Sequence, residues 1–288
     1  MKKILITGVA GFIASHFLKK LNGESDIVLH VRDEGEAQKI NKGGPRVLVG
    51  TKGLENLPEG ISCVVHLGGT AGGKIKECIE DNVLFTLEIL RAMEKARIPR
   101  IIFPSAAAIY GNTDKPARED APPNPLAPYE TTKLIAEEII KHWVESRRIH
   151  SAAILRFNNI YGPGSNHGMM ASFIRQAKQK TSISIDGDGT QVREPIYVDD
   201  AVDAIKRAIE MDEKGCVLYN ISGPEPYTLR EIVEYVGNAL DKKLTMNLSG
   251  KPASPPHTLR LDTVKAKNEL GWEPKILLAE GIAKILSL

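Results

Sequence analysis

The sequence has few of the features that mark metal centres, disulfide frameworks or membrane proteins. Three cysteines, Cys63, Cys78 and Cys216, are spread over 288 residues, and their spacing matches neither a metal site nor a disulfide framework. We therefore expect free thiols in a reducing cytoplasm. No apolar run reaches the ~18 residues of a membrane span. Gly8 and Gly11 interrupt the apolar start, which excludes a signal peptide.

An excess of charge of one sign is also lacking. The 38 basic residues nearly balance the 36 acidic ones, so the net charge is +2, and no basic block stands out. Nucleic-acid-binding domains usually show such a block, so we expect no nucleic-acid partner. Hydrophobic residues make up 42% of the chain, which is enough for one large domain or for a main domain with a smaller lobe.

Short runs rich in β-branched residues alternate with helical patterns along the first half of the chain. Near-continuous apolar strands separated by helices are typical of a parallel sheet covered on both faces. We therefore expect an α/β, Rossmann-type doubly wound parallel sheet of about seven strands. The expected strands are "KILIT", "DIVLHV", "RVLVG", "SCVVHL", "RIIFPS", "SAAILR" and "CVLYNIS".

The second half of the chain is less regular. Turn-rich segments such as "YGPGSNHG" and "SGPEPYT" are interleaved with helical patterns. We expect a dinucleotide-binding domain over residues 1–160, with a return segment at about 190–222, and a smaller substrate-binding lobe formed mostly by residues 161–288. Near the end, "LDTVKAKNELG" predicts a helix that Asp262 caps at its start and Gly271 at its end.

A glycine turn follows the first expected strand. In "ILITGVAGFIASHF", Gly8 and Gly11 precede a helix that begins near Phe12 and Ile13, and Ala14 takes the third position of a G-x-x-G-x-x-A pattern. Glycines allow the backbone to approach a pyrophosphate, whose charge a helix N-terminus favours. A tight turn without a ligand is the alternative. The place at the first strand–helix junction favours a dinucleotide site.

The end of the second expected strand bears on which dinucleotide is bound. An acidic residue there normally binds the adenosine ribose of NAD. In "LHVRDEGE", Arg32 takes the terminal position and Asp33 follows. A guanidinium suits a 2′-phosphate, so the sequence favours NADP over NAD. In the alternative, Arg32 is a solvated charge and Asp33 binds the ribose.

A tyrosine and a lysine lie four residues apart at the start of an expected helix. In "PYETTKLIAEE", Tyr129 and Lys133 therefore face the same way. A phenol titrates near ~10, and a lysine ammonium one turn away, together with a positive nicotinamide, would favour its phenolate form. The spacing therefore predicts that Tyr129 is a general acid–base catalyst and that Lys133 supports it. A tyrosine packed over a lysine stem is the structural alternative.

These motifs together with several others carry a resemblance. "TGVAGFIASH", "VVHLGG", "AAAIYG", "PYETTK", "RFNNIYGP", "GDGTQVREPIYVDD" and "LGWEP" follow one another over nearly the whole length. The chain resembles the extended short-chain dehydrogenases/reductases of the NAD-dependent epimerase/dehydratase family, which act on nucleotide sugars. The resemblance implies a nucleotide-sugar substrate, no metal, and a homodimer formed through helices at 82–97 and 129–147.

The resemblance also assigns roles to residues. Catalysis would rest on Tyr129 and Lys133. Asn82, Asn159 and Arg193 would contact substrate, although the two asparagines could be cap and turn residues and Arg193 could pair with a nearby aspartate. The expected cofactor-binding residues are Gly8, Gly11, Phe12, Ile13, Arg32, Leu67, Tyr129 and Lys133.

One position departs from the family pattern. A serine or threonine usually precedes the tyrosine of "IYG" by four residues and bonds the reacting substrate oxygen, but here that position is Ala106. A donor of this kind is worth about 10²–10³ in rate. Ala107 and Ala108 also replace the acidic residue of dehydratases and decarboxylases, which disfavours 4,6-dehydration. Candidate substitutes for the hydroxyl are Ser105, Thr70, Thr131, Thr132 or a water.

Three functions remain open from the sequence. The first is an NAD(P)-dependent nucleotide-sugar epimerase that oxidises and re-reduces one carbon. The second is an NADPH-dependent nucleotide-sugar ketoreductase, which Arg32 favours. The third is a weakly active cofactor-binding regulator, for which Ala106 is the only support.

Overall fold

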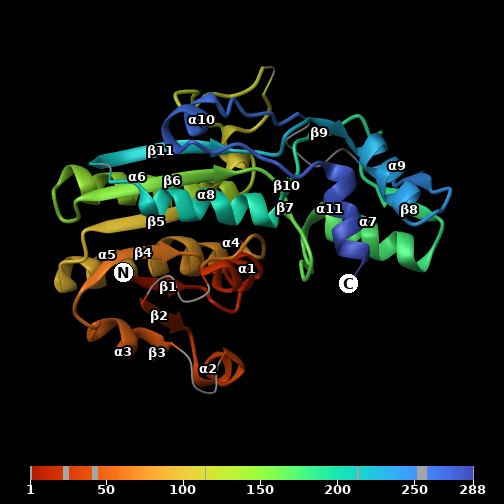
Figure 1. The fold of residues 1–288 in the computed structure, drawn as a ribbon. Coiled ribbons are helices and arrows are strands. Elements are labelled where there is room, and N and C mark those ends of the chain that lie inside the picture. The colour runs from red at the N-terminus through yellow and green to blue at the C-terminus, as the bar shows by residue number, and fades with distance from the viewer. Residues whose placement is uncertain are drawn as a thin grey trace. The chain divides into compact units, whose positions relative to one another are not determined.

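The computed structural model describes residues 2–21, 26–40, 45–113, 115–212, 214–251 and 258–287. Figure 1 shows the helices and strands in chain order. They are β1 (Lys3–Thr7), α1 (Phe12–Leu21), β2 (Asp26–Val31), α2 (Glu34–Ile40), β3 (Arg46–Val49), α3 (Gly50–Glu55), β4 (Ile61–His66), α4 (Ile75–Cys78), the π-helix η1 (Ile79–Leu84), α5 (Phe85–Ala96), β5 (Arg100–Ala106), the 3₁₀-helix η2 (Ala107–Tyr110), α6 (Pro128–Glu145), β6 (Ser151–Phe157), β7 (Ile160–Tyr161), α7 (Gly168–Gln179), β8 (Ser182–Ile185), β9 (Val192–Arg193), β10 (Ile196–Tyr197), α8 (Val198–Glu210), β11 (Gly215–Ile221), β12 (Tyr227–Thr228), α9 (Leu229–Ala239), β13 (Thr245–Leu248), α10 (Val264–Leu270) and α11 (Leu278–Leu286).

A seven-stranded sheet has the order β11-β6-β5-β4-β1-β2-β3. The pairs of β1 with β2 and β4, of β2 with β3 and of β4 with β5 are parallel. The central part of this order is that of a doubly wound dinucleotide-binding fold. The predicted fold class and all seven predicted strands are therefore confirmed.

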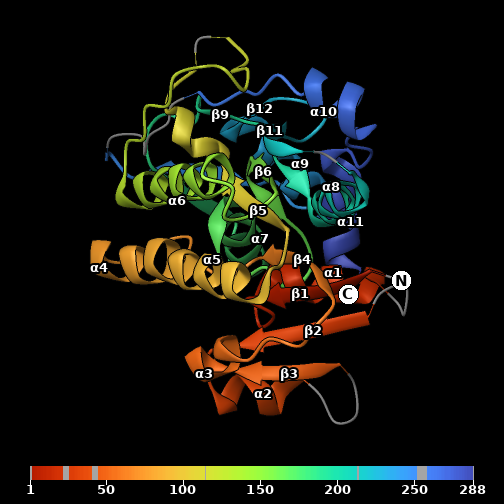
Figure 2. The ribbon, with the colours of Figure 1, turned by 90° about the vertical axis from the view of Figure 1, so that its left-hand side faces the viewer.

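Helices cover both faces of the sheet. Figure 2 shows α5 and α6 side by side on one face and α1 on the other. α1 begins at Phe12, as its sequence pattern predicted, and ends at Leu21, and it buries Ala14 and Phe17. The strands are mostly apolar because both of their faces are covered.

The core on the α5–α6 face consists of aliphatic side chains from strands and helices. Val64, Ile101 and Ile154 come from β4, β5 and β6, while Ile89 and Ile140 come from α5 and α6. All five are fully buried. Burying such a side chain stabilises the fold by about 1.5–3 kcal/mol, so this core fixes α6 against the sheet.

The chain divides into two compact units. The first comprises Met1–Ala106, Ala127–Leu155 and Ile205–Tyr219, and the second Ala107–Leu126, Arg156–Ala204 and Asn220–Leu288. The second unit holds two-stranded sheets in which β7, β9 and β8 pair with β10, β12 and β13. Its residues 107–126 belong to a stretch that the sequence reading had placed in the dinucleotide-binding domain.

The predicted C-terminal helix is α10 in the second unit. The Asp262 carboxylate accepts a hydrogen bond from the Val264 N–H at its start. Gly271 ends the helix in the left-handed conformation, with φ at 60°. The buried Trp272 then donates its indole N–H to the Asp200 carbonyl at 3.0 Å, which fastens the segment to α8.

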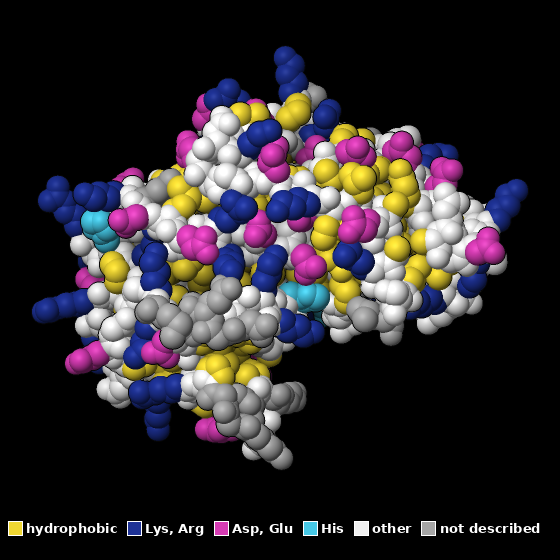
Figure 3. All heavy atoms as spheres, in the orientation of Figure 1, with side chains coloured by type: hydrophobic (Ala, Val, Ile, Leu, Met, Phe, Trp, Pro, Cys, Tyr) yellow, Lys and Arg dark blue, Asp and Glu magenta, His cyan; other side chains and the backbone are white. Residues whose placement is uncertain are grey.

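Charged side chains of both signs are interspersed over the surface that Figure 3 shows, without a concentrated basic area on that face. No helix within the described ranges is long and apolar enough to cross a membrane. Within those same ranges, no group of three or more His, Cys, Asp or Glu side chains is placed to hold a metal ion.

Candidate active site

The glycine turn after β1 lies against the loop after β4. Gly8 has a φ of 66°, and its carbonyl accepts the Gly11 N–H at 2.9 Å. A Cβ on Gly8 would lie 2.5 Å from the Gly68 nitrogen and 2.6 Å from the Leu67 carbonyl carbon. Both the conformation and the close approach require glycine here. The turn leads directly into α1, whose first turn contains no acidic residue.

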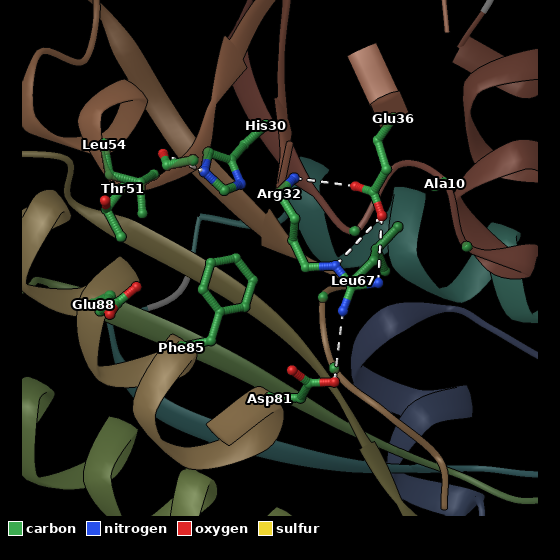
Figure 4. A pocket seen from close by; sticks show the side chains of 15 residues that line it. Ala10, His30, Arg32, Glu36, Thr51, Leu54, Leu67, Asp81, Phe85 and Glu88 are labelled. Carbon is green, nitrogen blue, oxygen red and sulfur yellow. Dashed lines mark hydrogen bonds and ion pairs between the residues drawn. The ribbon is translucent and has the colours of Figure 1, made fainter. Parts of the chain in front are cut away.

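A cavity of about 350 Å³ opens at this turn. Figure 4 shows its wall, which is built by the loops after β1 and β4, by the end of β2, and by residues of α2, α3, η1 and α5. The sequence-predicted Gly8, Gly11, Arg32 and Leu67 line it. Phe12 and Ile13 are the first residues of α1, so their N–H groups belong to the helix N-terminus, which favours an anion. A cavity of this size accommodates part of a dinucleotide.

The part of the cavity between β2 and α5 is largely apolar, with Glu88 of α5 at its edge. Leu54 and Phe85 lie there, and the His30 ring is 5.6 Å from the Phe85 ring. His30 Nε2 lies 3.1 Å from the Gly50 carbonyl, which can only accept, so this nitrogen carries the proton. Burial lowers the pKa of His30 below its ordinary value. The neutral ring thus forms a flat wall suited to a planar base.

Arg32 is held by two carboxylates. Its guanidinium lies 3.3 Å from Glu36 and 3.7 Å from Asp81, as the dashed lines in Figure 4 show. The Arg32 backbone N–H also donates to Glu36. Asp33 precedes α2, and its carboxylate accepts the Glu36 N–H and so caps the start of this helix. The preference for NADP assumed an Arg32 available to a 2′-phosphate, and this geometry does not support it.

The sequence analysis missed Glu36 and Asp81 because it considered only the residues directly at the end of β2. Glu36 lies four residues after Arg32 on an expected helix, so the spacing contained a signal. Asp81 comes from η1, and its approach to Arg32 depends on the fold. The cavity as a whole fits a dinucleotide: it combines an acid-free helix N-terminus, a glycine cradle and a flat neutral wall.

Tyr129 and Lys133 occupy the first two turns of α6. Lys133 is buried, and its ammonium donates to the Pro104 carbonyl at 2.7 Å and lies 3.9 Å from the centre of the Phe103 ring. Burial lowers the pKa of Lys133 to about 7, against an opposing effect of the Glu137 charge. The ammonium is therefore placed beside the end of β5, the strand that carries Ala106.

The surroundings of Tyr129 favour the protonated phenol. Burial raises its pKa to about 12, and the negative charge of Glu130 adds to the effect. Glu130 is itself buried, and one of its carboxylate oxygens makes no hydrogen bond with the described residues. Without added positive charge, Tyr129 is a proton donor.

Asn82 lies in η1 and is buried. Its side-chain oxygen accepts the Thr70 N–H at 2.9 Å. Its amide donates to the Thr70 carbonyl at 3.1 Å and to the Thr132 hydroxyl at 3.0 Å. Asn82 thus links the loop after β4 to the first turns of α6. π-Helical turns often occur at functional sites.

Ala106 is buried at the end of β5, so the position of the missing hydroxyl is apolar. The four candidate substitutes already donate within the protein: Ser105 to Glu137 at 2.5 Å, Thr70 to the Gly72 carbonyl at 2.7 Å, Thr131 to the Ala127 carbonyl at 3.1 Å and Thr132 to the Tyr129 carbonyl at 2.9 Å. A substrate would have to displace one of these bonds to gain a donor.

Asn159 and Arg193 belong to the second unit. Asn159 is exposed, and its carbonyl accepts the Ile196 N–H at 3.0 Å. Arg193 is partly buried in β9 and donates to the Val192 carbonyl at 2.8 Å. Burial lowers the pKa of Arg193 below its ordinary value. Their predicted substrate contacts stay predictions, as does the substrate contact of Asn82.

Known proteins resemble this chain over its whole length. The family model of the NAD dependent epimerase/dehydratase family matches residues 4–222. A putative UDP-glucose 4-epimerase of Methanocaldococcus jannaschii is 31% identical over 304 residues, which cover 99% of this chain and 97% of that protein. UDP-glucuronic acid decarboxylase 1 of Arabidopsis thaliana is 29% identical over 305 residues, which cover 99% of this chain and 69% of that protein.

Solved structures of nucleotide-sugar epimerases also resemble this chain. UDP-glucuronic acid 4-epimerase of Bacillus cereus, in complex with UDP-glucuronic acid and NAD, has a TM-score of 0.86 at 26% identity, with 99% of this chain and 98% of that one covered. UDP-glucose 4-epimerase of Thermotoga maritima, with UDP-glucose, has a TM-score of 0.86 at 27% identity, with 99% and 97% covered.

The buried Lys133 makes stability depend on pH. Its pKa is about 7 in the folded protein and 10.5 ordinarily, so between these values the unfolded chain binds more protons. The stability that the neutral Lys133 amine contributes is fully present above the unfolded pKa, and it is lost as the pH falls through the folded pKa of about 7. We expect the unfolding free energy of the wild type, minus that of Lys133→Met, to rise by up to about 1.4 kcal/mol per pH unit above neutrality.

Urea denaturation of the cofactor-free proteins between pH ~6 and ~9 measures this difference. Lys76→Met, at a lysine whose side chain is 83% exposed, is the control, and its difference from the wild type should not change with pH. A Lys133→Met difference that stays constant over the range would show that Lys133 is not desolvated.

Proposed function

Because the chain belongs to the NAD-dependent epimerase/dehydratase family, we propose that it is an NAD-dependent enzyme that epimerises the sugar of a nucleotide sugar. The observation that carries the proposal is the arrangement in the first unit. A dinucleotide-shaped cavity lies at the glycine turn, and Tyr129 and the buried Lys133 lie on one helix face. UDP-sugars are the substrates named for the similar proteins, and we propose the same class here.

In this proposal Tyr129 takes up and returns the proton of the reacting sugar hydroxyl. The bound nicotinamide supplies reversible hydride chemistry at the sugar carbon. Lys133 places its ammonium one turn after Tyr129 and is held there by the Pro104 carbonyl. Because burial and Glu130 keep the pKa of the phenol at about 12, positive charge is required before Tyr129 can act as a base.

Two observations favour epimerisation over the related reactions. Elimination or decarboxylation needs an acid–base group beyond the tyrosine, and Ala107 and Ala108 offer none at the end of β5. A ketoreductase that uses NADPH was favoured only by Arg32, whose guanidinium is neutralised by Glu36 and Asp81. Epimerisation requires one group that accepts a proton and later returns it, and in this proposal that group is Tyr129.

We propose NAD rather than NADP as the cofactor. Arg32 brings one positive charge, whereas its partners Glu36 and Asp81 bring two negative charges to the same part of the cavity wall. A 2′-phosphate would meet repulsion there, whereas a ribose hydroxyl would find a carboxylate acceptor. The Bacillus cereus epimerase binds NAD, in agreement with this choice.

We also propose a homodimer through α4, η1 and α6. These three elements pack against one another, and they expose Ile75, Ile79, Leu84 and Ile135, with 50%, 41%, 48% and 41% of each residue accessible. Apolar side chains that line up in this way mark interaction sites more often than solitary ones do. A second copy of the same face would bury them with two-fold symmetry.

Tyr129→Phe should abolish turnover. The substitution removes only the phenolic oxygen, and loss of a general acid–base group lowers rates by about 10²–10⁴-fold. Epimerisation of UDP-glucuronic acid and UDP-glucose, followed by NMR with added NAD, measures the effect. Tyr235→Phe, at a half-buried tyrosine in α9, is the control and should retain wild-type turnover.

If Tyr129→Phe kept wild-type turnover, the catalytic assignment would be wrong. A wild type that bound NAD tightly but converted no nucleotide sugar would favour a cofactor-binding regulator instead. The alanine at position 106, where the family pattern has a hydroxyl, is the observation in favour of that alternative.

The wild type should bind NADH more tightly than NADPH. In the double variant Glu36→Gln/Asp81→Asn, Arg32 gains a free guanidinium and the wall loses two negative charges, so NADPH affinity should rise by about tenfold or more. Fluorescence titration of both reduced cofactors measures this. Glu80→Gln, beside Asp81 but paired with Lys76, should leave the ratio unchanged. Tighter binding of NADPH by the wild type would contradict the proposal.

Ile135→Glu should convert the dimer to a monomer, since it places a charge in the centre of the apolar face. Sedimentation velocity at micromolar concentration measures the state. Val264→Glu, at a residue 58% exposed on α10, is the control and should stay dimeric. A monomeric wild type would refute the dimer.

A further inference from the structure

The first unit contains a buried chain of hydrogen bonds that the proposed mechanism does not use. The Gly68 N–H donates to the Thr7 hydroxyl at 3.2 Å, and that hydroxyl lies 2.7 Å from His66 Nδ1. On the other side of the ring, Nε2 lies 3.0 Å from the Thr86 hydroxyl, which donates to the Asn82 carbonyl at 2.7 Å. The side chains of Thr7, His66, Thr86 and Asn82 are all nearly fully buried.

The acceptor at one end fixes every proton in the chain. The Asn82 carbonyl can only accept, so the single hydroxyl proton of Thr86 points to it, and His66 Nε2 must donate to Thr86. A neutral imidazole then has its lone pair on Nδ1, so Thr7 donates to Nδ1 and accepts the Gly68 N–H. Of the two neutral tautomers, only the Nε2–H form satisfies all four bonds. Burial lowers the pKa of His66 to about 3, in agreement with a neutral ring.

One end of the chain holds the loop that lines the cofactor cavity. Thr7 ends β1 and is paired in register with His66 at the end of β4. A Cβ on Gly68 would lie 2.5 Å from the Phe85 ring, and one on Gly69 would lie 2.6 Å from the Asn82 side-chain oxygen. The loop therefore packs so tightly against Phe85 and Asn82 that neither Gly68 nor Gly69 has room for a side chain. Its Leu67 faces the cavity in Figure 4.

The other end reaches the catalytic helix. The Asn82 amide donates to the Thr132 hydroxyl at 3.0 Å, and Thr132 donates to the Tyr129 carbonyl at 2.9 Å. Displacement of the Asn82 backbone would thus shift the first turns of α6. The hydrogen bonds form a continuous path from the cofactor loop to the backbone of Tyr129.

We propose that His66 is a positioning residue that fixes the cofactor loop after β4 relative to the Tyr129 end of α6. This role rests on the proposed function, in which hydride and proton transfer require the cofactor and Tyr129 in one geometry. Misplacement of reacting groups by ~1 Å can lower rates by about 10²-fold. An imidazole suits the role because it accepts at one ring edge and donates at the other while remaining neutral.

Removal of the ring nitrogens tests the proposal. His66→Phe keeps an aromatic ring of similar shape between Phe85 and Phe103, whose rings lie 5.2 Å and 5.7 Å from it. We expect kcat for UDP-glucuronic acid to fall about 10- to 100-fold, KM for the sugar nucleotide to stay within about threefold, and the Kd for NAD to rise about tenfold. Ile140→Val, a core change in α6 away from the chain, should change stability and none of these three constants.

Two variants of Thr86 test the proposal if His66→Phe does not fold. Thr86→Val keeps the shape of Thr86 but removes its hydroxyl, and Thr86→Ser keeps the hydroxyl. Thr86→Val should lower kcat about tenfold while Thr86→Ser stays near the wild type, and His66→Phe/Thr86→Val should be no worse than His66→Phe alone. Equal kcat values for the Val and Ser variants would overturn the proposal, as would a folded His66→Phe with wild-type kcat.

Two readouts do not depend on turnover. ¹⁵N NMR of labelled histidine should show His66 neutral and protonated on Nε2 at pH ~5, and titration near its ordinary value of 6.5 would overturn the proposal. If the wild type converts no nucleotide sugar, the proposed function fails, but weaker NAD binding by His66→Phe than by Ile140→Val would still support the positioning role.

Discussion

The close contact between the ends of β1 and β4 determines the geometry of this site. The parallel register pairs Thr7 with His66 and brings the Gly8 turn so close to Leu67 and Gly68 that no Cβ fits. Both strands therefore end at one edge of the sheet, where their loops form the cavity wall. The glycine turn after β1 and the hydrogen bonds of His66 both depend on this register.

The two ends of the site differ in their electrostatic environment. At the Arg32 end, carboxylates from α2 and η1 neutralise the only guanidinium among the cavity-lining residues described. At the α6 end, a desolvated ammonium lies over an aromatic ring, and a phenol is kept protonated. Burial makes a charge on Lys133 unfavourable, and the Glu137 charge opposes this effect.

Local patterns sufficed to predict most of the fold. The seven strands and the start of α1 follow from runs of apolar residues and from helical spacing, because both report burial over a few neighbouring residues. The glycine turn was predictable for the same reason. The pairing of Arg32 with Asp81 and the bonds of Asn82 were not. They join residues 12 to 50 positions apart, and only the packed structure decides which polar groups meet.

The absence of a hydroxyl at Ala106 changes what the other groups of the site must do. Where a serine or threonine shares the substrate oxygen with the tyrosine, an error in the position of the tyrosine is partly compensated by the second donor. Here Ser105 is bound to the buried Glu137, and the remaining hydroxyls bond carbonyls. Catalysis would then rest on a single phenol, whose placement must be correspondingly exact. The interlocked bonds of Asn82, Thr132 and the Tyr129 backbone provide that rigidity without adding a donor.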